Sequence, residues 1–166
     1  MSIYQTKADS LLSFDMTKEG RSIGKLEYKR WFRYNAVITT SNSSYQLEPK
    51  GFWGTRIELK DGEKTLMKLS MNWKGEIAVQ TYFNDREEDY NLKHRGVFKE
   101  SFILTNEEGT ELLVMKPHLK WTKLNYDYQI STSDAFEASA NKELLLMASL
   151  YGANYYMSSI MSSIGL

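Results

Sequence analysis

Two stretches of this sequence, Tyr45–Leu59 (YQLEPKGFWGTRIEL) and Tyr90–Leu104 (YNLKHRGVFKESFIL), align with each other without a gap. The identical positions are Tyr45/Tyr90, Leu47/Leu92, Gly51/Gly96 and Leu59/Leu104. In both stretches apolar residues alternate with polar ones, which is the pattern of a β-strand with one buried face. Each stretch leads into a glycine turn, Asp61-Gly62 or Glu108-Gly109, beyond which Leu66-Met67 aligns with Leu113-Val114. We interpret the two stretches as copies of one duplicated β unit.

The remaining sequence before residue 134 also predicts short strands separated by turn residues. They are expected at Lys25–Thr40, Thr65–Trp73, Glu76–Phe83, Glu111–Lys116 and Asn125–Thr132, in addition to the strands of the repeat. No helical period is found in this region, and residues 1–24 are expected to supply the first strand or two. The sequence therefore predicts an all-β body, about residues 3–132, of roughly ten to twelve strands.

The last part of the chain predicts a helix over about residues 135–163. Asp134 is the expected N-cap, with Glu137 three residues later as in a capping box. On a helical wheel one apolar face contains Leu146, Leu150, Ala153, Met157, Ile160, Met161 and Ile164. Beside it lies a stripe of small residues, Ser149, Gly152, Ser159 and Ser163, where another segment can approach closely.

The surroundings of this helix decide the fold, because no residue from Leu144 to Leu166 is charged. Such a helix has to be buried. A barrel of about twelve strands has room for a helix along its axis and leaves no exposed sheet edge. We therefore expect one domain, 1–166: a closed antiparallel barrel of two duplicated units, about six strands each, around a central hydrophobic helix. The alternative is a C-terminal membrane anchor lying outside the β body.

The duplicated strand unit and the final uncharged helix, at about this length, resemble the LURP-one-related proteins of the tubby C-terminal-like superfamily, which includes the phospholipid scramblases. The resemblance covers roughly residues 25–166. It implies a twelve-stranded barrel around a hydrophobic C-terminal helix. It also implies an anionic-lipid site, because tubby domains bind phosphoinositide head groups through surface Lys and Arg.

Composition excludes several functions. The chain has no cysteine, so disulfides, thiolate catalysis and Cys-ligated zinc are excluded, and an intracellular protein is favoured. Lys+Arg and Asp+Glu are both 21, so we expect no nucleic-acid partner. No catalytic motif is present, and we expect no enzyme activity, cofactor or metal. His94 and His118 are expected at the surface, and Trp31, Trp53, Trp73 and Trp121 in the barrel core and wall.

Binding candidates come from basic residues near the repeat. Lys50 and Arg95 occupy equivalent positions before the two glycines, and we predict a lipid- or anion-binding site at Lys50, Arg56, Lys93, Arg95 and Lys99. We expect a monomeric, non-enzymatic binding or scaffold module, cytoplasmic and peripheral at a membrane, docking on anionic phospholipid or on a protein partner. The alternatives are a small-ligand carrier or enzyme with a site at the barrel mouth, and the tail-anchored protein.

Overall fold

The computed structural model describes residues 1–30, 33–52, 54–96, 100–120 and 125–163. Strands β1 to β6 are Ser2–Ser10, Ser13–Lys18, Arg21–Arg30, Arg33–Thr40, Ser44–Lys50 and Arg56–Asp61. Strands β7 to β12 are Lys64–Met71, Ile77–Phe83, Arg86–Arg95, Ser101–Asn106, Glu111–Lys120 and Asn125–Thr132. Two helices follow, α1 (Asp134–Glu137) and α2 (Lys142–Ser163).

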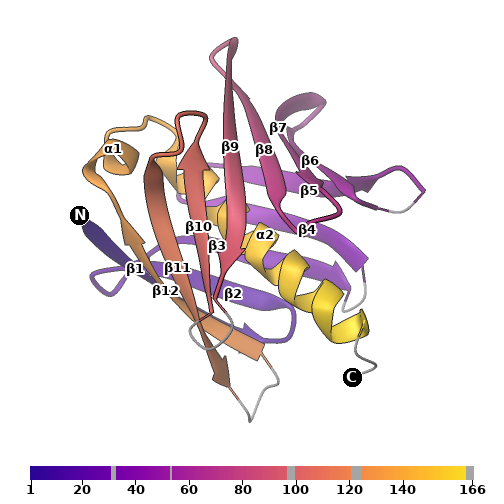
Figure 1. The fold of residues 1–166 in the computed structure, drawn as a ribbon, viewed down its shortest axis with the longest axis horizontal. Helices are drawn as coiled ribbons and strands as arrows, with labels where there is room; N and C mark the ends of the chain where they lie inside the picture. The colour runs from indigo at the N-terminus through magenta and orange to yellow at the C-terminus, as the bar shows by residue number, and fades with distance from the viewer. Residues whose placement is uncertain (31–32, 53, 97–99, 121–124, 164–166) are drawn as a thin grey trace.

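The strands form one closed antiparallel barrel (Figure 1). Each strand pairs with its neighbours in sequence, and β1 pairs with β12, so that Tyr4 lies opposite Ile130. Side chains alternate between the two faces of the wall. In β7, for example, Met67 and Leu69 are buried whereas Lys68 between them is exposed. The predicted closed twelve-stranded barrel with a C-terminal helix is confirmed.

The repeat has the same pairing register in both copies. Leu47 lies opposite Leu59 in the β5–β6 hairpin, as Leu92 lies opposite Leu104 in β9–β10. The following hairpin of each copy shifts register directly after Leu59 or Leu104. The two copies are four strands apart, because β5 corresponds to β9, so the spacing of the repeat differs from the six strands expected for each unit.

The register also corrects the alignment beyond the turns. Leu59 pairs with Met67 and Leu104 pairs with Leu113, so Met67 is the structural equivalent of Leu113. The sequence alignment had matched Leu66 to Leu113. The difference arises because the longer loop of the second copy adds one residue between the paired strands, whereas the alignment allowed for two.

Helix α2 fills the interior of the barrel (Figure 1). Every residue from Leu144 to Tyr155 is buried, so the helix is covered on all sides rather than on one apolar face. Two of its buried polar side chains have partners on the wall. The Tyr151 hydroxyl donates to the Tyr34 carbonyl of β4 at 2.7 Å, and Asn154 Oδ1 accepts from the Tyr128 hydroxyl of β12 at 2.9 Å. The helix therefore serves as the barrel's core.

The predicted helix is interrupted in the structure. Ser133, not Asp134, is the N-cap of α1, because its side chain accepts a hydrogen bond from the Phe136 amide at 3.2 Å. The chain then leaves helical structure between Glu137 and Lys142 before α2 begins. The break has a geometric reason: α1 lies over one end of the barrel with Phe136 buried, and α2 has to turn from there into the interior (Figure 1).

At the other end of α2 the helix leaves the barrel. Ile160, predicted on the apolar face, is 39% exposed, while the Met161 side chain and Ile164 lie outside the described residues. The predicted small stripe has its closest packing at Gly152, where an added Cβ would lie 2.8 Å from Leu92 Cδ2. No helix in the described part of the chain is long and apolar enough to span a bilayer.

Candidate functional site

The barrel has two ends that differ in chemistry. The α1 end contains helix α1 and the connections that follow β2, β4, β6, β8 and β10. The exit end contains the connections that follow β1, β5 and β7, together with the last turns of α2. Helix α2 begins at the α1 end and emerges at the exit end (Figure 1). Binding sites in barrels are commonly built at such ends, where loops converge.

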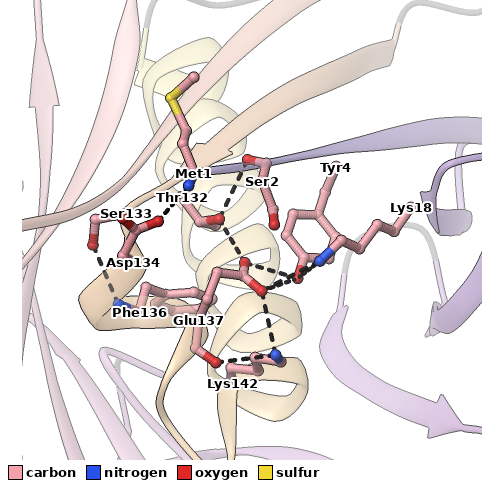
Figure 2. Close-up of polar contacts among 10 residues, drawn as sticks. All are labelled: Met1, Ser2, Tyr4, Lys18, Thr132, Ser133, Asp134, Phe136, Glu137 and Lys142. Atoms are coloured by element: carbon pink, nitrogen blue, oxygen red, sulfur yellow. Dashed lines mark hydrogen bonds and ion pairs between the residues drawn. The ribbon is translucent and has the colours of Figure 1, made fainter.

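At the α1 end, the Glu137 carboxylate is the centre of a hydrogen-bond network (Figure 2). It accepts from the Tyr4 hydroxyl at 2.9 Å and from the Thr132 hydroxyl at 2.6 Å. The ammonium groups of Lys18 and Lys142 lie 3.3 and 3.2 Å from it. These partners come from β1, β12, β2 and the start of α2. The network therefore ties both helices to three strands.

The pKa of Glu137 follows from these contacts. Burial acts to raise it, but the hydrogen bonds from Thr132, Tyr4, Lys142 and Lys18 outweigh burial and lower the pKa to about 2. The carboxyl is thus ionised at neutral pH, and its hydrogen-bond donors are side chains of the protein itself. This arrangement is a structural clamp, since each donor around the carboxylate belongs to the fold. Sequence analysis predicted a capping role for Glu137 and missed its long-range partners, because β1 and β2 carried only weak strand signals.

The connections at the α1 end are acidic. They contain Glu19, Glu63, Asp85, Glu107 and Glu108, all of them exposed. These connections are described in full and contain neither Lys nor Arg. These connections are therefore negative, although the whole chain has zero formal net charge and exposed Arg21, Lys64 and Arg86 begin the strands beside them.

The exit end has the opposite character. Exposed Lys and Arg side chains lie at its strand ends and in the turn after β7, namely Lys29, Arg30, Arg56, Lys74 and Arg95. Like charges face each other across β5 and β6, because Lys50 is the Cα partner of Arg56. Such a pair of cations does not stabilise the sheet. Among the described residues, no ion pair is found for Arg30 or Arg56.

Large apolar side chains are exposed at the same end. Phe52 is 92% and Trp73 is 89% exposed. Trp73 was predicted in the core or wall of the barrel, and this prediction is wrong, because the residue lies in the β7–β8 turn beyond the last paired residues. Trp31, Trp53 and Trp121 lie outside the described residues. The exposure of Trp73 could not be predicted, because the alternating pattern of Thr65–Trp73 continues through this residue without a break.

The predicted binding residues form two separate groups. Lys50 and Arg56 are cross-strand partners, and Lys50 Nζ lies 2.9 Å from Glu48. Lys93 and Arg95 lie four strands away on β9. Their partners are carboxylates, with Lys93 Nζ 3.6 Å from Glu76 and Arg95 Nη2 2.7 Å from Glu111. Lys99 lies outside the described residues.

The two histidines differ. His118 is exposed as expected, but His94 is half-buried, so the surface prediction is wrong for it. Its ring stacks on Tyr156 at 4.9 Å between centroids and lies edge-on to Phe102 at 5.3 Å. Its Nε2 atom is buried with no hydrogen-bond partner among the described residues. The reason is register: His94 pairs with the inward-facing Phe102 and shares its side of the wall.

The described part of the molecule contains a cavity beside Gly152 and Tyr151 with a volume of about 10 Å3, which is room for one water. An open groove of about 410 Å3 lies at the α1 end between the β4–β5 turn and the α1–α2 connection. Its lining is mostly hydroxyl and amide side chains. The cavity is apolar but far smaller than a small-molecule site, and the groove is open and polar, so neither is typical of such sites.

The fold and the two ends define a closed twelve-stranded antiparallel barrel that encloses its C-terminal helix and separates charge between its ends. Comparisons of the chain with protein-family models, with curated proteins and with solved structures find no match.

Proposed function

We propose that this protein is a non-enzymatic module that docks on anionic phospholipid surfaces through the exit end of its barrel. One observation carries the proposal: basic residues gather at the exit end, whereas the connections at the α1 end are acidic. A neutral chain with this separation has no general attraction to polyanions, but its two ends respond differently to a charged surface. Each basic residue near an anionic leaflet contributes about 1 kcal/mol.

The like-charged pair of β5 and β6 supports this function. Lys50 and Arg56 are cross-strand partners and place two cations opposite each other at the exit end. A lipid phosphate between two cations would relieve their repulsion. Of the residues predicted from sequence, Lys50, Arg56 and Arg95 belong to this surface. Lys50 and Arg95, like Lys93, already face carboxylates and would add less than Arg56.

The architecture also supports the family proposal. A twelve-stranded antiparallel barrel around its C-terminal helix is what resemblance to the LURP-one-related and tubby-like proteins implies. We propose membership of that superfamily on this ground, and with it a monomeric, peripheral protein on the cytoplasmic side of a membrane.

The test is flotation of the full chain with vesicles of phosphatidylcholine alone or with about 30% phosphatidylserine, at low and high salt. We expect binding to the acidic vesicles only, weakened by salt because screening shortens the range of exposed charges. Arg30→Glu with Arg56→Glu should weaken it about 30-fold or more, from the loss of about 1 kcal/mol per cation.

The control reverses two exposed cations at the α1 end, Arg21→Glu with Lys64→Glu. It changes the net charge by the same amount at the opposite end. Binding should remain within a few-fold of the original chain. Equal losses in the two double variants would show that only total charge matters, and absence of binding to acidic vesicles would refute the proposal.

A further inference from the structure

The exposed apolar residues are concentrated at the end that carries the basic residues. Leu11, Phe52, Trp73, Leu119 and Ile160 lie at the exit end, and Met1 and Ile3 at the α1 end are the remaining exposed large hydrophobic residues in the described part of the chain. The two most exposed aromatic side chains, Phe52 and Trp73, come from connections on either side of the β6–β7 pair. Two large aromatic side chains in water on neighbouring loops indicate a contact surface.

The fold holds these two loops in place. The Met71 amide donates to the Thr55 carbonyl at 3.2 Å and joins the loops to each other. Helix α2 fastens each loop from inside, since the Tyr155 hydroxyl donates to the Gly54 carbonyl at 3.1 Å. The Tyr156 ring packs under Gly75, where an added Cβ would lie 2.9 Å from the ring.

The turn that carries Trp73 is fixed by its own hydrogen bonds. The Asn72 side chain accepts from the amides of Lys74 and Glu76 at 2.9 and 3.0 Å. Gly75 has a φ of +78°, and its amide donates to the Asn72 carbonyl at 3.1 Å. The turn therefore presents Trp73 outward at little further entropic cost on binding.

The chemistry around these aromatics fits the interface of a lipid bilayer. Lys74 Nζ lies 5.3 Å from the centre of the Trp73 ring, and Arg56 begins the strand that follows the Phe52 loop. Tryptophan prefers the headgroup level of membranes, and a neighbouring lysine reaches the phosphates. A peripheral protein holds an anionic bilayer by this combination of inserted apolar side chains and surrounding cations.

We propose that the exit end inserts Phe52 and Trp73 into the interface of an anionic bilayer, so that the barrel stands on the membrane with its α1 end pointing away. This inference rests on the proposed function, and it adds which residues enter the lipid and how the barrel is oriented. The outer part of α2, with Ile160, then faces the headgroups.

The absence of cysteine allows a direct test with single labelled positions. Phe52→Cys, Trp73→Cys and, at the α1 end, Glu63→Cys each receive an environment-sensitive nitrobenzoxadiazole dye. With acidic vesicles we expect a blue shift and a several-fold rise in emission at positions 52 and 73, and no change at 63. A shift at 63, or water-like spectra at all three positions on bound protein, would overturn the orientation.

A second measurement distinguishes failure of this inference from failure of the proposed docking function. Phe52→Ala with Trp73→Ala should weaken binding to acidic vesicles about tenfold or more. The remaining binding should be electrostatic and should be abolished by high salt. Ile3→Ala, exposed at the α1 end, is the matched control and should have no effect. If acidic vesicles bind but the double alanine variant binds equally well, insertion is wrong and docking stands, and the aromatic pair would then serve a protein partner. If no acidic vesicle binds, both are wrong.

Discussion

The two ends of this barrel hold the same helix in different ways. At the α1 end, charged and hydroxyl groups from three strands converge on Glu137 and fix the point where the chain turns into the interior. At the exit end α2 is held by close packing around Gly152 and by rings stacked on Tyr156. The first end fixes the helix through a charged network, whereas the second fixes it by packing and leaves two large aromatic side chains exposed. The contrast indicates that polar contacts hold the helix at one end and ring packing at the other.

The largest effect is expected at the clamp. Glu137→Gln should lower the free energy of unfolding by about 3 kcal/mol, because Lys18 and Lys142 would keep their partly buried charges without a charged partner. Chemical denaturation measures this change. Glu76→Gln, whose carboxylate is 3.6 Å from Lys93 at the exit end, is the matched control and should cost less than about 1 kcal/mol. Equal losses would remove the distinction between the ends.

The same carboxyl makes the clamp sensitive to acid. Its pKa is about 2 in the folded protein and near the ordinary value of 4.5 in the unfolded chain. Ionised Glu137 therefore stabilises the fold fully above about pH 5, and this contribution disappears as the pH falls towards 2. Denaturation curves of the original chain and of Glu137→Gln should differ most at neutral pH and converge near pH 2. A constant difference across this range would contradict the assignment.

The next largest effect tests packing of the helix. Gly152→Val should lower the free energy of unfolding by about 2 kcal/mol, because the added side chain meets Leu92 and Ile77 and the neighbouring cavity of about 10 Å3 is too small for it. Thermal and chemical denaturation measure the loss. Ser158→Val, at an exposed position of the same helix, should change stability by less than about 0.5 kcal/mol. A tolerated valine at 152 would show that α2 is loosely packed there.

The smallest effect should be a gain. His94→Phe keeps a ring between Tyr156 and Phe102 and removes a buried nitrogen that has no partner among the described residues. We expect the free energy of unfolding to rise by about 1 kcal/mol. His118→Phe, at an exposed site, should leave it unchanged. A loss of stability on His94→Phe would show that this nitrogen is satisfied in solution.

Much of the fold could be predicted because two signals were strong. The repeat fixed strand identity and even register, since Leu47 and Leu92 have equivalent partners. The uncharged stretch after Leu144 required burial, which a large barrel provides. The number of strands per unit could not be predicted, because alternation gives the faces of a strand but not the number of strands between matching segments.

The chemistry of the ends was harder to predict for physical reasons. Whether a cation at a strand end is neutralised depends on neighbours far away in sequence, as the contact of Arg95 with Glu111 shows. The orientation of Trp73 depends on where β7 stops pairing, which the alternating pattern does not mark. Glu137 was expected to act locally, yet its partners Tyr4 and Lys18 lie more than a hundred residues away.

The order of elements along the chain has a consequence for how this protein is made. Strand β1 finds its second neighbour only when β12 has been synthesised, and the helix that fills the interior comes after both. While the ribosome is still translating, the emerging strands have inward faces but nothing to pack them against. They are open to mispairing during this interval, because exposed strand edges and apolar faces promote aggregation. Completion of the barrel thus has to await the emergence of α2 from the ribosome, and a chaperone that shields the nascent strands should raise the yield of native protein.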